Sequence, residues 1–148
     1  MVYIVAGMKY GVSKSKTAVS FAMSLSQKNN KEILLLDADP AGMSSEYLQW
    51  HKTNYPVANL RVEKICPSQV EERLMNIDEL FDEVIIDIGL GEGLKESLLH
   101  SDRLLVPLNS KDQSLWIMWV ISNLEKNLEN TLDRRDSFEA QSFFIDDP

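Results

Sequence analysis

Lysine, serine and aspartate side chains that could bind phosphate and a metal ion occur in two separated stretches of the chain. In the first, the apolar run Val2–Ala6 leads into K-Y-G-V-S-K-S-K at residues 9–16 and then into a helical pattern. A strand, a Gly/Ser/Lys-rich turn and a helix predict an anion site, because backbone N–H groups and the positive end of the helix dipole face the ligand. Lys14 then supplies a charge for the β- and γ-phosphates, and Ser15 a hydroxyl for Mg²⁺.

The second stretch is I-L-L-L-D-A-D-P at residues 33–40, in which Asp37 and Asp39 follow an apolar strand. A carboxylate at a strand end can hold the waters of a metal ion or orient an attacking water. The alternative is turn chemistry, since Asp-Pro pairs often begin turns. Asp87, at the end of the apolar run that begins at Val84, has the same two interpretations. We favour the functional one for all three.

The loop before Lys14 departs from the phosphate-loop pattern G-x-x-x-x-G-K-[ST]. Met8 replaces the first glycine of the pattern, and Ser13 replaces the glycine before Lys14. Taken alone, the loop is therefore a weak signal, and a polar turn with chance lysines explains it equally well.

With Lys9 included, the loop resembles the deviant Walker A motif, K-G-G-x-G-K-[ST]-T, of the ParA/MinD family of ATPases. The segment Thr17–Leu25 resembles the first helix of that family, and D-A-D-P at 37–40 resembles its D-x-D-P segment. The segments at 81–87 and 101–107 resemble its Walker B strand and the strand that follows. These segments occur in the family's order over roughly residues 1–125, and the small plasmid-partition members are the most similar.

The resemblance implies ATP and Mg²⁺ as cofactors and gives each residue a role. Lys14 would bind phosphate in its own subunit, Lys9 would reach the nucleotide across an ATP-bridged homodimer, and Asp39 would orient the hydrolytic water. The implied catalytic residues are therefore Lys9, Lys14 and Asp39. The implied nucleotide-binding residues are Lys9, Gly11, Val12, Ser13, Lys14, Ser15 and Lys16, and the implied metal-binding residues are Ser15, Asp37 and Asp87.

Two residues of the loop differ from the family motif in a way that is expected to weaken nucleotide binding and hydrolysis. Tyr10 stands at one of the paired glycines, and Ser13 at the glycine before the lysine. If these positions need φ > 0 or close backbone approach, a side chain there costs about 1–3 kcal/mol. Such a cost weakens nucleotide binding on the order of 10–100-fold.

Alternation of strand and helix patterns predicts an α/β fold of the P-loop NTPase type, with three α/β/α layers and a mostly parallel sheet. The predicted strands are Val2–Ala6, Ile33–Leu36, Leu60–Ile65, Val84–Asp87, Leu104–Val106 (stopped by Pro107) and a short sixth strand, Gln141–Ile145. The predicted helices are one after the loop that ends at Asn29-Asn30, one capped by Ser44 or Ser45 that runs to Trp50, and the stretches Gln69–Leu80 and Ser110–Leu128.

Side-chain spacing predicts which parts of these helices are buried. Ala18, Phe21, Ala22 and Leu25 recur at the i, i+3, i+4, i+7 spacing of one helix face. Trp50, together with Tyr47, is expected to pack rather than to recognise a ligand. The G-x-G-x-G run at 89–93 does not have dinucleotide-binding spacing. It predicts either a loop that senses the γ-phosphate or a mere turn.

A length of 148 residues predicts a single domain, 1–148, in which residues 130–148 form an acidic tail or a last short strand. The resemblance implies that this domain is a version shortened at its C-terminus, or a fragment, because family members usually continue with further strands and helices. The single cysteine, Cys66, permits no intrachain disulfide, and no apolar run is long enough to span a membrane. We therefore expect a cytoplasmic protein that does not associate with a membrane. A net charge of −8 argues against direct DNA binding.

The leading hypothesis is a ParA-like ATP-binding protein, a slow ATPase that forms a nucleotide-dependent dimer. It would act with an adaptor protein in plasmid partition or cargo positioning. The alternative is a degenerate ParA-like scaffold that binds partner proteins without hydrolysing ATP. A third idea, reductive chemistry at an iron–sulfur cluster, is disfavoured because a single cysteine supplies too few ligands.

Overall fold

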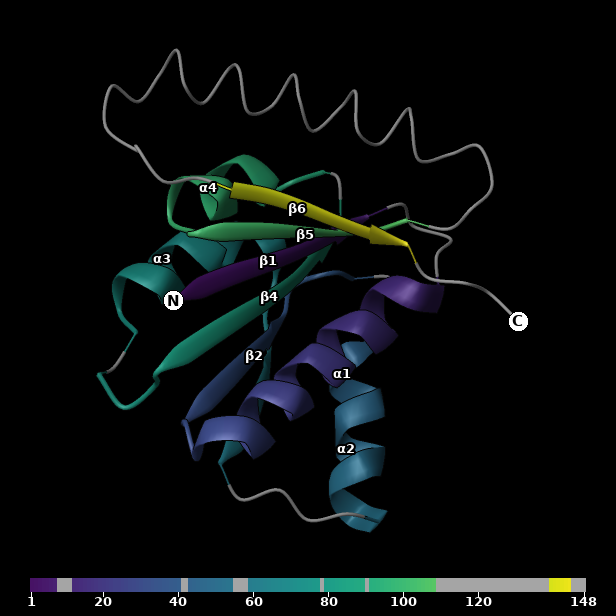
Figure 1. The fold of residues 1–148 in the computed structure, drawn as a ribbon. Coiled ribbons are helices and arrows are strands. Elements are labelled where there is room, and N and C mark those ends of the chain that lie inside the picture. Colours follow the sequence, from purple (N-terminus) through teal and green to yellow (C-terminus); the bar gives the residue numbers. More distant parts are fainter. Residues whose placement is uncertain are drawn as a thin grey trace.

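A six-stranded sheet forms the centre of the molecule, with the strand order β3-β2-β4-β1-β5-β6 (Figure 1). The computed structural model describes residues 1–7, 12–40, 43–54, 59–77, 79–89, 91–108 and 139–144. All five strand pairs are parallel. The strands are β1 (Val2–Gly7), β2 (Ile33–Asp37), β3 (Leu60–Lys64), β4 (Glu83–Gly89), β5 (Arg103–Leu108) and β6 (Glu139–Phe144).

Helices cover both faces of this sheet and produce the three layers predicted from the sequence. α1 (Val12–Asn29) and α2 (Ser44–Asn54) pack on one face, and α3 (Val70–Met75) and α4 (Leu94–Leu99) on the other (Figure 1). A 3₁₀ turn, Pro67–Gln69, precedes α3. Each face has its own apolar core, so the α/β fold of the P-loop NTPase type is confirmed.

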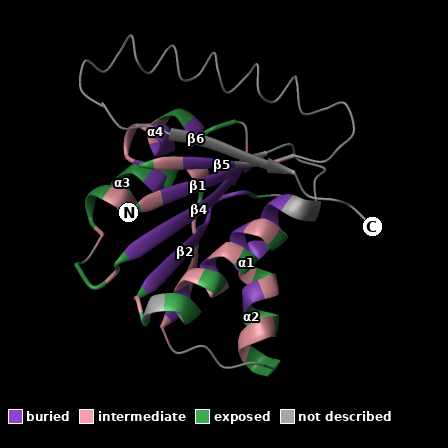
Figure 2. Cartoon of the chain, viewed as in Figure 1, coloured by how far each residue is buried: buried purple, intermediate pink, exposed green. Residues whose placement is uncertain are grey.

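The inner strands are apolar because the sheet is covered on both sides. Every residue of β2 is buried, and β4 is buried from Glu83 to Ile88 (Figure 2). A strand enclosed by two neighbouring strands and two helical layers is expected to lack polar alternation. This enclosure buries Asp37 at the end of β2 and Asp87 in β4.

The predicted apolar face of α1 is confirmed. Ala18 and Ala22 are buried in the core beneath α1 and α2, and Phe21 and Leu25 pack against the same cluster. The Phe21 ring meets Tyr3 of β1 edge to face, with ring centroids 4.9 Å apart. The helix ends at Asn29, and Asn30 has a left-handed φ of 49°, as expected for an asparagine that ends a helix.

The prediction for α2 was wrong in three respects. Neither Ser44 nor Ser45 caps the helix through its hydroxyl; the carboxylate of Asp37 instead accepts a hydrogen bond from the backbone N–H of Ser45 at 3.0 Å. The helix also continues past Trp50 to Asn54. Trp50 is 60% exposed, because it lies outside the buried stripe that contains Leu48, and its ring meets only His51 edge to face among the described rings. Tyr47, in contrast, packs against the core as predicted.

Two predicted element ends were also wrong. The helix expected over Gln69–Leu80 is shorter, since α3 ends at Met75 and the Asn76 side chain donates to the carbonyl of Glu72. Pro107 does not stop β5, which continues to Leu108 alongside β6. The register of β5 with β1 ends at Leu105, so Pro107 lies beyond the residues that pair with β1.

The helix α4 was not predicted from the sequence, although its buried residues Leu94 and Leu98 are four positions apart, as on one face of a helix. The predicted sixth strand is confirmed as β6, whereas the helix expected over Ser110–Leu128 lies outside the described residues. Among the helices that the structure describes, none is both long and apolar enough to cross a membrane.

Gly93 occupies a position that requires glycine. Its φ is +82°, it precedes α4, and an added Cβ would meet the backbone carbonyl oxygen of Pro67. We predict that Gly93→Ala lowers the free energy of unfolding by about 1–3 kcal/mol, because a left-handed backbone and a backbone contact both oppose the new methyl group. Denaturant titration measures the change.

Gly91→Ala is the matched control. No heavy atom lies within 4 Å of a Cβ added at Gly91. Its free energy of unfolding should stay within about 0.5 kcal/mol of the wild-type value. Equal losses in the two variants would contradict the role assigned to Gly93.

Candidate phosphate and metal site

Five of the residues singled out in the sequence lie together beyond the carboxyl ends of β2 and β4. Lys14 and Ser15 lie in the first turn of α1, Asp37 ends β2, Asp39 follows two residues later, and Asp87 belongs to β4. Asp37 and Asp87 are register partners on neighbouring strands, and the amide of Ala38 donates to the carbonyl of Asp87 at 2.8 Å. The parallel sheet therefore aligns the carboxylates, and α1 brings the cation and the hydroxyl to them.

Lys14 is buried between two carboxylates. Its ammonium nitrogen lies 2.7 Å from Oδ2 of Asp39 and forms a second ion pair with Oδ1 of Asp87. Only 4% of the residue is exposed. A buried ammonium needs such partners, since an unpaired charge in the interior is costly.

The Ser15 hydroxyl joins three elements. It donates to Oδ2 of Asp87 at 3.2 Å and accepts from the backbone N–H of Met43, just before α2, at 3.1 Å. One oxygen atom therefore connects α1, β4 and the start of α2. Any ligand that binds this oxygen must share it with the amide of Met43.

Asp37 is fully buried, and only one of its two carboxylate oxygens accepts a hydrogen bond from a described residue. Its Oδ2 accepts from the amide of Ser45 at 3.0 Å, while its Oδ1 has no hydrogen-bond partner among the described residues. The N-terminus of α2 stabilises the negative charge on Oδ2. A buried carboxylate oxygen without a partner is expected where a ligand, a water or a cation belongs.

Carboxylates outnumber cations among the described side chains of the site. One lysine (Lys14) lies among three buried aspartates (Asp37, Asp39 and Asp87). Buried net charge is costly unless a counter-charge compensates it. A divalent cation meets this requirement, and the Ser15 hydroxyl with nearby carboxylates is a hard oxygen donor set of the kind Mg²⁺ takes.

No group of three His, Cys, Asp or Glu side chains in the described part of the chain forms a ready metal cage. Mg²⁺ does not require such a cage, because it keeps several waters and uses one or two protein oxygens together with phosphates. The residues present therefore fit Mg²⁺ held with a phosphate ligand rather than alone.

The structure brings together Lys14, Ser15, Asp37, Asp39 and Asp87, whereas Lys16 is exposed on α1. Lys9 and Gly11 lie outside the described residues, as do the side chains of Val12 and Ser13.

Two contributors were not predicted from the sequence: the backbone amides of Met43 and Ser45, which nothing in the sequence indicated. A Cβ added at Gly89 would lie 3.7 Å from the Asp39 carboxylate. The G-x-G-x-G run predicted as a loop at the phosphates or a turn therefore begins close to the site.

Comparisons with known proteins agree with this architecture. Residues 3–141 match the family described as the CobQ/CobB/MinD/ParA nucleotide binding domain. No curated protein sequence matches the chain at a significant level.

Three solved structures illustrate the likeness of fold. A plasmid partition protein from Borrelia burgdorferi has a TM-score of 0.63 and 18% identity, over 97% of this chain and 89% of that one. Cobyrinic acid a,c-diamide synthase from Mycobacterium smegmatis, with bound ADP and magnesium, has a TM-score of 0.70 and 17% identity, over 97% and 74%. The MinC:MinD cell division protein complex from Aquifex aeolicus has a TM-score of 0.60 and 16% identity, over 96% and 68%.

At these identities the solved structures show the fold alone. The family match spans nearly the whole chain and includes every residue of the buried cluster. This chain therefore belongs to the CobQ/CobB/MinD/ParA nucleotide binding domain family.

Proposed function

We propose that this chain is a ParA-like protein that binds ATP with Mg²⁺, hydrolyses it slowly, and acts in plasmid partition or cargo positioning. The observation that carries the proposal is the buried cluster in which Lys14 and Ser15 face Asp37, Asp39 and Asp87. A phosphate-binding lysine and a hydroxyl beside carboxylates at strand ends are the parts that phosphoryl transfer requires. The plasmid partition neighbour and the ADP- and magnesium-bound neighbour support the same assignment.

In this proposal, Lys14 binds the β- and γ-phosphates. To do so, it exchanges its ion pairs with Asp39 and Asp87 for phosphate oxygens. The first backbone N–H groups of α1, which have no partners within the helix, lie on either side of Lys14 and add further donors. Lys9, Gly11, Val12, Ser13 and Lys16 complete the nucleotide contacts implied by the family motif.

Ser15 would hold the metal directly, and Asp87 and Asp37 would orient its waters. When bound, Mg²⁺ offsets charge on the transferring phosphoryl group. Asp39, once Lys14 has moved to the phosphates, would accept a proton from the attacking water or orient it. Gly89 leaves room beside that carboxylate.

Lys9 would contact the nucleotide of a second subunit, which makes hydrolysis dependent on a dimer bridged by ATP. A partner protein would tune this cycle; one structural neighbour, the MinC:MinD complex, likewise pairs two different proteins. The net charge of −8 disfavours direct contact with DNA, so an adaptor would provide the connection to the cargo in the cytoplasm.

The second candidate is a ParA-like scaffold that binds partners without turning over ATP. Two observations favour this scaffold. The ammonium group of Lys14 is already engaged in two ion pairs, and Tyr10 and Ser13 stand where the family motif has glycines. A turnover assay with and without candidate partners separates the two functions. Nucleotide-dependent change in elution volume tests the dimer.

Lys14→Ala should abolish ATP binding, because the variant loses the charge that the proposal places on the phosphates. Isothermal titration of ATP and ADP, with and without Mg²⁺, measures the loss. Circular dichroism checks the fold, since the variant also leaves two buried carboxylates without their cation.

Lys28→Ala is the control for that experiment, because Lys28 is an exposed lysine in the last turn of the same helix. ATP affinity should be unchanged in this variant, since the site lies at the other end of α1. Unchanged ATP affinity in a folded Lys14→Ala variant would place the nucleotide site elsewhere.

Asp37→Asn should reduce the dependence of ADP binding on Mg²⁺. The amide oxygen can still accept from Ser45, but one buried negative charge is gone, so apparent magnesium affinity should fall about 10–100-fold. Titrating Mg²⁺ into the ADP-bound protein and following its melting temperature measures this affinity.

Asp102→Asn is the matched control. Asp102 also accepts a backbone amide hydrogen bond, from Val2 at 2.8 Å, but at the amino end of the sheet. Magnesium dependence should be unchanged in this variant. An equal shift in both variants would remove Asp37 from the metal site.

A further inference from the structure

Along its outer edge, β3 has a row of backbone groups that bond to no described residue. β3 is the terminal strand of the sheet and pairs only with β2 among the described strands. The carbonyl of Asn59 and the amide of Ile65 both bond to β2, at 2.9 and 3.0 Å. Since backbone groups alternate sides along a strand, the N–H and C=O groups of Leu60, Val62 and Lys64 face outward. Such an edge is a template for another strand.

The side chains of β3 are complementary to a second copy of the same strand. In an antiparallel pair centred on Val62, Val62 of one copy lies opposite Val62 of the other, and Leu60 of each copy lies opposite Lys64 of the other. These are the residues whose N–H and C=O groups face outward, so they can form the hydrogen-bonded pairs of an antiparallel ladder. The same register places Arg61 of each copy opposite Glu63 of the other. Opposite charges at directly facing positions stabilise strand pairs.

Both side chains of that charge pair already have partners within the chain and remain accessible to another. Glu63 accepts from Nε and Nη2 of Arg73 at 2.7 and 2.8 Å, which lowers the pKa of Glu63. Arg61 is exposed and lies over the Phe81 ring, 5.4 Å from its centroid. Since a carboxylate has about four acceptor sites, Glu63 can bind a second guanidinium.

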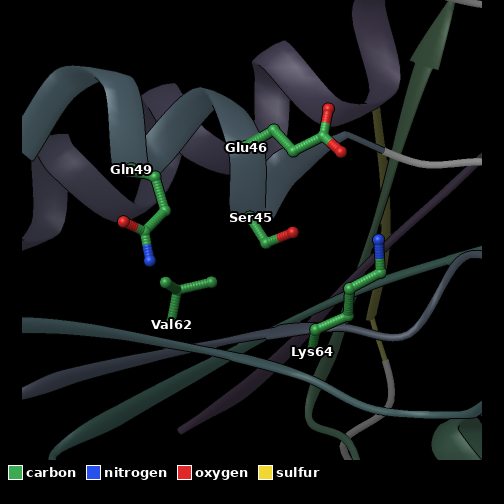
Figure 3. Close-up of a pocket in the computed structure, with 5 residues that line it drawn as sticks. All are labelled: Ser45, Glu46, Gln49, Val62 and Lys64. Carbon is green, nitrogen blue, oxygen red and sulfur yellow. The ribbon is translucent and has the colours of Figure 1, made fainter.

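A groove beside this edge fits an aromatic side chain of the second copy. Figure 3 shows Ser45, Glu46 and Gln49 of α2 above Val62 and Lys64 of β3; these five residues line a groove of about 460 Å³. Gln49 points toward Val62, so the groove combines an apolar floor with acceptors and an ammonium group. These are partners for an indole, which has an apolar face, an N–H donor and a π-system that attracts cations.

The chain carries a suitable indole close to the same edge. Trp50 is 60% exposed and lies four residues after Glu46, on the same stripe of α2. Ser45 lies beside Lys64 and Gln49 beside Val62, so α2 runs antiparallel to β3. A two-fold axis at Val62 would therefore bring the end of one α2 toward the beginning of the other. Trp50 of each copy would then lie beside the groove of its partner, as an isologous interface requires.

We propose that two copies of this chain associate through antiparallel pairing of β3 with β3, with Trp50 of each copy in the α2–β3 groove of the other. This interface is distinct from the nucleotide-bridged dimer, because Lys14 lies beyond the carboxyl ends of the strands and not along the β3 edge. It forms without ATP. A chain with both interfaces can assemble beyond a dimer when nucleotide is bound.

Sedimentation of the full chain without nucleotide tests the interface. The wild-type chain should show a concentration-dependent dimer. Val62→Pro should weaken it at least about tenfold, because proline removes the outward N–H on the axis and leaves the pairing with β2 intact. Trp50→Ala, a change at an exposed position, should weaken it similarly. Circular dichroism confirms that each variant is folded.

A charge reversal tests the register. Arg61→Glu places like charges opposite each other at two symmetric positions, and should also weaken the dimer about tenfold or more. Lys95→Glu on α4 is the matched control, since it changes net charge equally at an exposed residue on a helix that packs on β4. Equal effects of the two reversals would mean that only net charge matters, and would overturn the register.

A cross-link provides a measurement that does not depend on proline. In a Cys66→Ser background, Val62→Cys should form an intermolecular disulfide under mild oxidant, because facing residues of a hydrogen-bonded pair have Cα atoms about 5.5 Å apart. Lys95→Cys in the same background should not. A chain that stays monomeric without nucleotide at all concentrations, or two cysteine variants that cross-link equally, would overturn the proposal. Neither result affects ATP binding at Lys14.

Discussion

Three aspartates buried around one lysine, among the described residues beyond the carboxyl ends of β2 and β4, are the constraint on which the rest of the site depends. The sheet fixes Asp37 and Asp87 on neighbouring strands, and the turn after β2 adds Asp39. Lys14 compensates for only part of their charge, and Oδ1 of Asp37 is left without a partner among the described residues. A protein keeps such an arrangement at a cost in stability, which a ligand carrying a divalent cation can offset.

The two helices on one face of the sheet serve this cluster in different ways. α1 contributes side chains, since Lys14 and Ser15 lie in its first turn. α2 contributes backbone, since the amides of Met43 and Ser45 bond to Ser15 and Asp37. The start of α2 is therefore held by the same two side chains that are proposed to face the metal.

Much of the fold and part of the site could be predicted because the relevant signals are local. Apolar runs that end in aspartate gave β2 and β4, and the Ala18–Ala22 spacing gave the buried face of α1. The ends of elements depended on tertiary contacts: a carboxylate from β2 caps α2, and pairing with β6 carries β5 past Pro107. The amides of Met43 and Ser45 could not be predicted, because any residue supplies an amide and only the folded chain aims it.

The two ion pairs of Lys14 would also affect how the proposed nucleotide binding responds to nucleotide concentration. A ligand that needs this ammonium competes with two carboxylates already in place, so its apparent affinity is lowered by the fraction of molecules in which the lysine is released. A nucleotide bound as proposed would therefore fill the site only at a higher concentration than the same contacts would need if Lys14 had no ion pairs. The geometry around this one amine would set that concentration.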